Sequence, residues 1–395
     1  MRVVQTVFGV FHHFDLARQL QRRGDLAAVF STWPWQRLQR EGIPHDKVST
    51  FPWIHTPEFL LRRAGLLPTW LEDWTGYSNA LTFDEYTLRC IPECDALIGI
   101  SGSSLKTGAL VQKRGGRFFC DRGSSHQRYQ EELVSDEFRR WNVHAPVSDP
   151  RDTAREEAIY AMADAITVPS SFAARSFIAM GVAPDKVHTV PYGVRLERFH
   201  PAPEAPCHPS EHFEALFVGS VGLRKGIPYL LEAFASVDHP RKRLRIVGAK
   251  SGEIGPVLSR LPLEHVEFLG SQPQERVAEL MGESHLLVLP SIEEGLALVQ
   301  GQALACGCPV LATTNTGAED LFTDEREGFI VPIRDPVALR DRMQRIIDEP
   351  TLWERMRSAA LLHVQTLGGW ETYGDRWQAL LHSEQVQDYR PPPTK

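Results

Sequence analysis

Short apolar runs alternate with stretches of helical periodicity along most of the chain. His13–Gly24 is a typical intervening stretch, with Phe14, Leu16, Ala17 and Leu20 on one helical face. Buried strands that alternate with amphipathic helices are typical of βαβ units and of parallel sheets. The expected strands are 2–9, 26–31, 96–101, 117–121, 165–170, 187–193, 215–220, 244–249, 266–270, 285–291, 308–314 and 328–333.

A polar, proline-rich stretch interrupts this alternation near the middle of the chain. Between His200 and Pro209 the prolines are too closely spaced for a helix or a central strand, so a linker is expected. The fold class predicted is α/β, with two Rossmann-like domains that face each other across a cleft where a ligand binds at the carboxyl ends of the strands. The predicted units are a first domain at 1–198, a linker at 199–212, a second domain at 213–370, and a C-terminal helix with a disordered tail at 371–395, the helix packing back on the first domain.

The segment 51–90 departs from simple βαβ rhythm because it is rich in aromatic residues. One interpretation is a helical insertion that packs on the first domain. The other is a surface that faces an acceptor or a lipid, since aromatic and basic segments suit membrane interfaces.

Composition narrows the class of protein. The chain has 395 residues, 42% of them hydrophobic and 24% charged, as is ordinary for a globular protein of two domains. A formal net charge of −7 argues against a nucleic-acid partner. The six cysteines lack zinc-site spacing. No cleavable leader and no membrane span are expected, so the predicted location is cytoplasmic, with peripheral contact to the inner face of a membrane as the alternative.

The stretch from Phe217 to Phe234 combines glycines with two cations between an expected strand and a helix. Gly222 would let a phosphate approach the backbone, and Arg224 and Lys225 would supply positive charge beside the helix amides. The alternative is a solvated turn with surface cations.

The stretch "EEGLALVQGQALACGCPV", which begins at Glu293, has a second strand-to-helix turn. A carboxylate at Glu294 could accept hydrogen bonds from sugar hydroxyls, and Gln302 follows about two helical turns later. Alternatively, Glu294 only caps the helix. The backbone amides expected to meet a phosphate at the helix start are those of Gly295, Leu296, Ala297 and Leu298.

These residues carry a resemblance to a known family. The stretches 217–234, 286–317 and 327–339, with 163–177 and 190–201 before them, resemble the motifs of glycosyltransferase family 4 in their order. That family has the GT-B fold and consists of retaining enzymes that use nucleotide sugars. The likeness covers about 161–339, whereas the chain before Asp121 matches only in its strand–helix rhythm.

The resemblance implies roles for residues of the second half. The family has a Glu, seven residues, then a second Glu; Glu294 takes the first place, toward the transferred sugar, and Gln302 the second, toward the ribose. The amide at 302 is a weaker acceptor, which puts affinity for the sugar donor in question. Arg224 and Lys225 are expected at the diphosphate, although Ser220 stands where the family has an Arg. Gly248 and Gly270 are expected near the nucleoside.

In the first half, Asp121 lies roughly where many relatives have a His that faces the sugar of the sugar donor. Asp121 and His126 are therefore the catalytic candidates beside Glu294. The loop residues Gly9, His12, His13 and Arg122 are expected at the cleft and the acceptor, unless they are ordinary solvated loop residues.

The predicted function is a metal-independent, retaining glycosyltransferase that moves a sugar from a UDP- or GDP-linked sugar donor to an acceptor hydroxyl, without a cofactor. Glycan or lipid-linked acceptors in surface polysaccharide, glycolipid or glycoconjugate assembly are the expected partners. The alternative is a degenerate, non-catalytic relative that binds a nucleotide sugar or a partner protein, because Gln302, Ser220 and Asp121 all depart from the family pattern. A dinucleotide oxidoreductase is disfavoured, since the first expected strand ends in a single glycine rather than GxGxxG.

Overall fold

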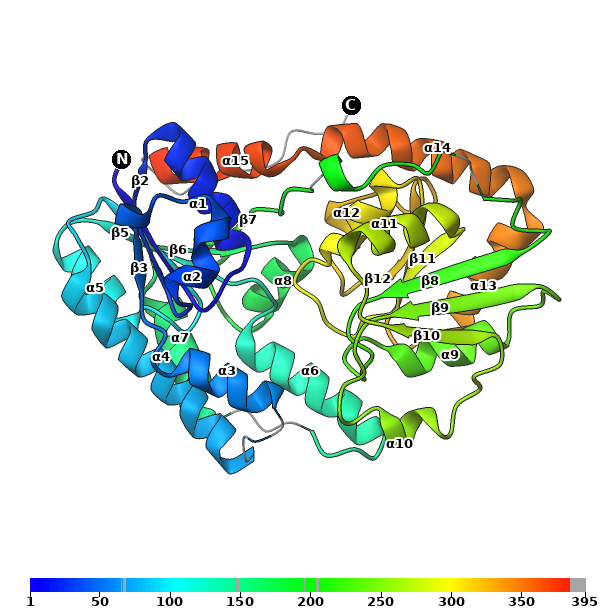
Figure 1. The fold of residues 1–395 in the computed structure, drawn as a ribbon, viewed down its shortest axis with the longest axis horizontal. Helices are drawn as coiled ribbons and strands as arrows, with labels where there is room; N and C mark the ends of the chain where they lie inside the picture. The colour runs from blue at the N-terminus through cyan, green and yellow to red at the C-terminus, as the bar shows by residue number, and fades with distance from the viewer. Residues whose placement is uncertain (65, 67–68, 146–148, 195, 204–205, 384–395) are drawn as a thin grey trace.

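Two parallel sheets form the core of the molecule, each within its own domain (Figure 1). The computed structural model describes residues 1–64, 66, 69–145, 149–194, 196–203 and 206–383. The expected α/β class and the two Rossmann-like domains are confirmed. The strand alternation in the sequence correctly identified this architecture, because buried parallel strands are nearly continuous apolar runs.

The first sheet has the order β3-β2-β1-β4-β5-β6-β7, and all its pairings are parallel. Its strands are β1 (Val3–Val7), β2 (Leu26–Ser31), β3 (Val48–Thr50), β4 (Ala96–Ile100), β5 (Arg117–Asp121), β6 (Ala165–Val168) and β7 (Val187–Thr189). The helical elements of this part are α1 (His12–Arg23), α2 (Trp35–Leu38), η1 (Gln39–Glu41), η2 (His45–Lys47), α3 (His55–Arg63), α4 (Thr69–Cys90), α5 (Leu105–Lys113), α6 (Gln127–Arg140), α7 (Pro150–Met162), α8 (Ser171–Ala179), η3 (Pro184–Lys186) and η4 (Leu196–Arg198).

The second sheet has the order β10-β9-β8-β11-β12-β13, again all parallel. Its strands are β8 (Phe213–Val218), β9 (Lys242–Val247), β10 (Val266–Gly270), β11 (Leu286–Leu289), β12 (Val310–Thr313) and β13 (Gly328–Val331). The helical elements are α9 (Ile227–Ala235), α10 (Gly255–Leu258), α11 (Gln274–Glu283), α12 (Leu298–Ala305), η5 (Ala318–Asp320), α13 (Pro336–Asp348), α14 (Pro350–Leu367) and α15 (Trp370–His382).

The last two helices run along one end of both domains, with α14 over the second domain and α15 over the first (Figure 1). Trp377 of α15 is fully buried and meets Phe119 of β5 edge-on. Arg23 of α1 forms an ion pair with Asp375 at 2.5 Å. Helix α15 is therefore part of the first domain's core, whereas the expected "PPPTK" tail lies outside the described residues.

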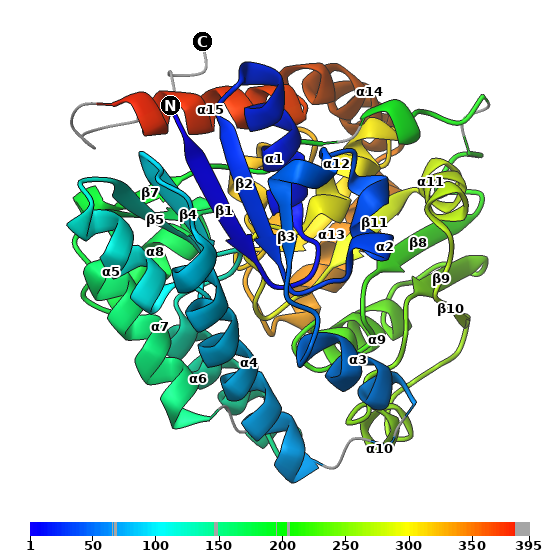
Figure 2. The same cartoon turned by 60° about the vertical axis from the view of Figure 1, so that its left-hand side comes forward.

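Helices α3 and α4 occupy the segment 55–90 and lie at the opposite end of the molecule from α15 (Figure 2). Asp84 on α4 caps α5 by accepting hydrogen bonds from the amides of Lys106 and Thr107 at 2.9 and 3.0 Å. Arg155 of α7 binds the same carboxylate at 2.6 Å in a buried ion pair. The segment is thus anchored on the first domain through α4. No helix in the described part of the chain combines the length and the apolar composition that crossing a bilayer requires.

Candidate functional site

The turn between β8 and α9 holds the two cations that the sequence singled out. Gly226 has φ +67, and a Cβ there would lie 1.9 Å from the carbonyl oxygen of Pro290, so only glycine fits. Pro290 follows β11, the neighbour of β8 in the sheet. This close approach brings Arg224 and Lys225 next to the turn that carries Glu294.

Lys225 and Glu294 form an ion pair between these two turns. The Ser291 hydroxyl donates a second hydrogen bond to the same Glu294 carboxylate oxygen, at 3.0 Å. Both charged side chains are largely buried. Burial lowers the pKa of Lys225, and Arg224 adds to this effect, while Glu294 opposes it. The structure therefore brings the predicted sugar carboxylate and a predicted diphosphate cation into direct contact.

Helix α12 begins at Leu298, the last of the four residues that were expected at the helix start. The reason is that the preceding backbone pairs with the segment after β12: the amides of Glu294 and Ala297 donate to Asn315 and Thr316 carbonyls at 2.9 and 3.3 Å. The Ala297 amide, one of those expected to meet a phosphate, therefore has a protein partner. The expectation that a helix supplies all four amides is corrected accordingly; Gly295 and Leu296 lie in the turn before it.

Gln302 lies on α12 and lines a cavity of about 220 Å³ between the domains. His12 of the first domain lines the same cavity, as do Gln274 and Trp370. The residue expected at the ribose and one expected at the acceptor thus share one space.

Three glycines line the ends of neighbouring strands in the second sheet. The Gly248 amide donates to the Gly270 carbonyl at 2.9 Å. A Cβ on Gly248 would lie 1.8 Å from the Gly219 carbonyl oxygen, and one on Gly222 would lie 2.4 Å from the Ser251 hydroxyl. The turns that carry Gly222, Gly248 and Gly270 are therefore close together, and their contact with a nucleotide stays a prediction.

The first domain contributes a cluster of two histidines and one carboxylate. Asp121, at the end of β5, lies 2.8 Å from His12 Nε2 and 3.2 Å from His13 Nε2. The Thr167 hydroxyl also donates to Asp121, at 2.8 Å. Within the described residues, this trio offers three ligand atoms within 4.8 Å of one another and could hold a metal ion.

Burial makes His13 a neutral side chain. It lowers the His13 pKa to about 3, with a further contribution from His12 and an opposing one from Asp121. Burial acts to raise the pKa of Asp121, but His12 and the Thr167 hydroxyl hold it below its ordinary value. The cluster is therefore a carboxylate stabilised by imidazole and hydroxyl groups. Such a carboxylate can orient His12 for proton transfer.

His126 and Arg122 lie on the loop after β5 but do not join this cluster. The His126 ring packs against Tyr160 and Phe177, each with centroids 5.0 Å away, and burial lowers its pKa to about 4. Arg122 donates to Gln127 and Gln130 at 2.8 Å each. Their predicted contacts with sugar or acceptor stay predictions, because in this structure both side chains are engaged within the first domain.

Gly9 lies where β1 turns toward α1. It has φ +70, and a Cβ there would lie 2.6 Å from Trp33 Nε1. Its amide donates to the Thr32 hydroxyl at 2.9 Å. Glycine therefore shapes the loop that carries His12 and His13.

Glu293 is the residue that sequence reasoning missed. It precedes Glu294, is fully buried, and accepts hydrogen bonds from Ser124 and Ser125 of the first domain at 2.7 and 2.8 Å. Arg224 binds its other carboxylate oxygen at 3.2 Å. The doubled glutamate in "EEG" was a signal, but sequence spacing could not say which of the two faces the other domain.

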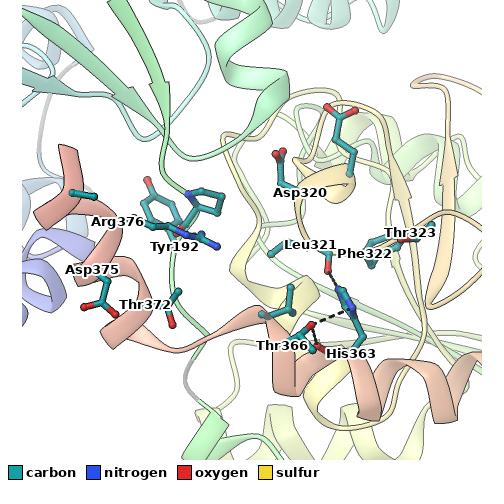
Figure 3. A pocket seen from close by; sticks show the side chains of 14 residues that line it. Tyr192, Asp320, Leu321, Phe322, Thr323, His363, Thr366, Thr372, Asp375 and Arg376 are labelled. Atoms are coloured by element: carbon teal, nitrogen blue, oxygen red, sulfur yellow. Dashed lines mark hydrogen bonds between the residues drawn. The ribbon is translucent and has the colours of Figure 1, made fainter. Parts of the chain in front are cut away.

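A larger cavity, of about 660 Å³, lies where α14, α15 and the segment around η5 meet (Figure 3). Tyr192 and Arg376 lie on one side of it, and His363 lies on the other, where its Nε2 donates to the Leu321 carbonyl at 2.9 Å. It contains none of the predicted site residues.

Two family models match consecutive parts of the chain. The model described as Glycosyltransferase Family 4 matches residues 123–198, and that described as Glycosyl transferases group 1 matches residues 202–362. A D-inositol 3-phosphate glycosyltransferase from Catenulispora acidiphila is 31% identical over 59% of this chain and 60% of its own length. One from Streptomyces scabiei is 33% identical over 48% and 47%. The chain thus spans about half to three fifths of these two relatives.

Solved structures with the same fold cover nearly the whole chain. Sucrose-phosphate synthase from Thermosynechococcus elongatus has a TM-score of 0.71 at 20% identity and covers 96% of this chain and 98% of its own. HepE from Anabaena in complex with UDP has a TM-score of 0.67 at 15% identity, with 96% and 99% covered. At these identities, the likeness establishes the arrangement of the two domains.

Proposed function

Because this chain belongs to the GT-B, family 4-like glycosyltransferases, we propose that it transfers a sugar from a nucleoside diphosphate to an acceptor hydroxyl with retention. The observation that carries the proposal is the Lys225–Glu294 pair at the facing turns of β8 and β11. A cation for the diphosphate and a carboxylate for the sugar are side by side, as the two ends of one sugar donor require.

In the proposed complex the sugar donor lies on the second domain. Glu294 accepts hydrogen bonds from sugar hydroxyls, while Lys225 and Arg224 neutralise the diphosphate together with amides of the turn at Gly295. Gly248, Gly270 and Gln302 surround the nucleoside. Two cations take the role that a divalent metal ion has in other transferases, so the proposed reaction is metal-independent.

The proposed reaction needs no enzyme nucleophile. The acceptor oxygen forms a bond to the anomeric carbon on the face from which the diphosphate leaves. The bond from that carbon to the diphosphate oxygen breaks, and its electron pair stays with the diphosphate. The acceptor proton passes to a leaving diphosphate oxygen. Electrostatic stabilisation and alignment then supply most of the rate enhancement.

The first domain is proposed to hold the acceptor. The Asp121–His12 pair supports this assignment, because His12 also lines the interdomain cavity that contains Gln302. D-inositol 3-phosphate, named in the relatives from Catenulispora and Streptomyces, belongs in the acceptor panel beside glycan and lipid-linked alcohols.

The test is nucleotide binding followed by transfer. UDP, GDP and ADP, and their glucose conjugates, are compared by thermal unfolding; a ligand at about 100 times its Kd stabilises by about 2.7 kcal/mol. Sugar release is then measured with and without acceptors. Stabilisation by one nucleotide together with acceptor-dependent release is the expected result. Stabilisation without transfer or hydrolysis supports the non-catalytic alternative, and no stabilisation by any nucleotide contradicts the proposal.

A peripheral contact with a membrane is also proposed, through α3 on the acceptor side of the protein. Trp53, Leu60 and Leu66 are 75%, 57% and 69% exposed around this helix, which an apolar interface would bury. The wild-type chain should co-sediment with vesicles that contain anionic lipid. A smaller fraction of a Trp53→Ser, Leu60→Ser variant should co-sediment with them. Equal sedimentation of both proteins would contradict this contact.

A further inference from the structure

The Glu293 side chain forms hydrogen bonds to residues of the first domain, whereas the adjacent Glu294 side chain binds Lys225 and Ser291 of its own domain. The first-domain groups that bind it lie on the loop after β5 and on α6: Ser124 at 2.7 Å, Ser125 at 2.8 Å and Gln130 at 2.7 Å. The Arg224 guanidinium, from its own domain, lies 3.2 Å from Oε2 and donates to the Glu293 carbonyl at 2.8 Å. The carboxylate therefore joins a predicted diphosphate cation to the loop that begins at Asp121.

The burial of Glu293 depends on contact between the domains. A buried carboxylate is strongly unfavourable unless hydrogen bonds and a counter-charge compensate it. Although burial acts to raise the pKa of the Glu293 carboxyl, the Arg224 charge and the first-domain hydrogen bonds hold it below its ordinary value. Separation of the domains would remove three of its donor side chains at once.

The backbone around Glu293 supports the same conclusion. A Cβ on Gly295 would lie 2.0 Å from the Gly123 carbonyl oxygen, so the two loops touch with no room for a side chain. The Ser170 hydroxyl donates to the Gly295 carbonyl at 2.5 Å. The turn after β11 is thus held against the first domain on both sides of Glu294.

We propose that Glu293 is a positioning residue that couples closure of the first domain to the placement of Arg224. The inference rests on the proposed function, in which Arg224 binds the diphosphate. When the domains meet, the Ser124–Ser125 loop satisfies one carboxylate oxygen and leaves the other for Gln130 and Arg224. Closure and orientation of the cation are then one event, so water is excluded when the diphosphate contact is complete.

A surface ion pair between the same domains provides a matched control. Arg175 and Glu319 lie within 2.5 Å of each other, with side chains 56% and 42% exposed. Exposed pairs of this kind contribute about 0 to 1 kcal/mol. Glu319→Gln therefore removes an interdomain carboxylate without removing a buried one.

The first test needs no activity and uses amide hydrogen exchange. The Ser125 amide donates to Glu293 Oε1 at 3.3 Å, and the next amide, His126, donates to the Ser176 hydroxyl of its own domain at 2.8 Å. In Glu293→Gln the Ser125 amide should exchange at least about tenfold faster, while His126 changes less than about threefold. Glu319→Gln should change neither. Equal exchange of Ser125 in wild type and Glu293→Gln would overturn the coupling.

The second test separates binding from turnover. Glu293→Gln should lower kcat about tenfold or more and leave the affinity for UDP, or for whichever nucleotide the wild type binds, within about threefold. Ser124→Ala with Ser125→Ala should reproduce the loss from the first domain, which also covers a Glu293 variant that does not fold. A loss seen only in nucleotide affinity, or none, would overturn the proposal. If the wild type binds no nucleotide, the proposed function fails, while the exchange test still decides the interdomain contact.

Discussion

The two domains carry charge in different ways on the sides that face each other. The side of the first domain with His12, His13 and Asp121 is the first edge, and the side of the second domain with Arg224, Lys225 and Glu294 is the second edge. On the second domain, Lys225 pairs with Glu294 between two turns of the same sheet, and Arg224 is the more exposed cation beside it. On the first domain, Asp121 is surrounded by imidazoles, and His13 is buried and neutral. At the second edge, the charged side chains can exchange their present partners for the charges of a ligand. The first offers a fixed arrangement around one carboxylate. This difference matches a division between binding of the charged sugar donor and orientation of an acceptor.

The largest expected effect tests the two cations of the second edge, Lys225 and Arg224. Lys225→Ala should lower kcat by roughly 10² to 10³, because a preorganised group at the leaving diphosphate is lost, and adding Arg224→Ala should lower it further. Sugar transfer is measured at saturating sugar donor, with Tm recorded for each variant.

Lys106→Ala is the control for this pair of substitutions. Lys106 pairs with Glu85 at 3.1 Å on the exposed face of the first domain, so its removal should leave kcat within about twofold. If the double variant keeps wild-type turnover at saturating sugar donor, the second edge does not bind the diphosphate.

The next-largest effect tests whether His13 of the first edge is neutral in the folded protein. Burial lowers the pKa of His13 in the folded protein to about 3, from an ordinary value of 6.5. As the pH falls through 6.5, His13 of the unfolded chain binds a proton that His13 of the folded chain excludes, so the fold loses stability until about pH 3. Between about pH 7 and about pH 4.5, His13 should cost the wild type about 2 to 3 kcal/mol. Urea unfolding of His13→Gln should show a pH dependence weaker by that amount.

His382→Gln provides the comparison for loss of an imidazole, since His382 is exposed at the end of α15. The other buried histidines in the described part of the chain, His126, His188, His239 and His285, are unchanged in both variants and cancel in the difference. Parallel stability curves for wild type and His13→Gln would show that His13 takes up a proton in the fold.

The contrast between the edges also explains what the sequence could reveal. The strands, the β8 and β11 turns and the Lys225 and Glu294 candidates followed from local patterns, because apolar runs and glycine turns depend on neighbouring residues. The short strand β3 escaped because three half-buried residues give too little periodicity. The start of α12 was misplaced because its preceding amides pair with a segment about twenty residues away.

The first edge depends on tertiary contacts that no local pattern contains. His12 and Asp121 are 109 positions apart, and they meet because β1 and β5 both flank β4 in the sheet. His126 looked available on a polar loop, yet its ring fills an aromatic cluster. Glu293 and Glu294 have the same side chain and adjacent positions, and only the approach of the first domain distinguishes them.

The smallest expected effect concerns Gln302, which lines the cavity between the two domains. Gln302 and His12 line the same interdomain cavity, and the proposed ribose contact of Gln302 is made by a neutral amide. Gln302→Glu should tighten binding of the preferred nucleoside diphosphate about three- to tenfold, because a carboxylate makes stronger hydrogen bonds to hydroxyl groups than an amide does. Titration calorimetry of UDP, or of whichever nucleotide the thermal panel selects, measures the change.

Two comparisons decide whether the gain comes from the ribose. The 2′,3′-dideoxy form of the same nucleotide lacks both hydroxyls, so Gln302→Glu should give it no gain in affinity. Gln274→Glu introduces the same charge at another residue lining the cavity and should not tighten binding. A gain that persists with the dideoxy nucleotide would assign the effect to the electrostatics of the cavity. Weaker binding of the intact nucleotide would show that its phosphates, rather than its ribose, approach position 302, and the two edges would then divide the sugar donor differently.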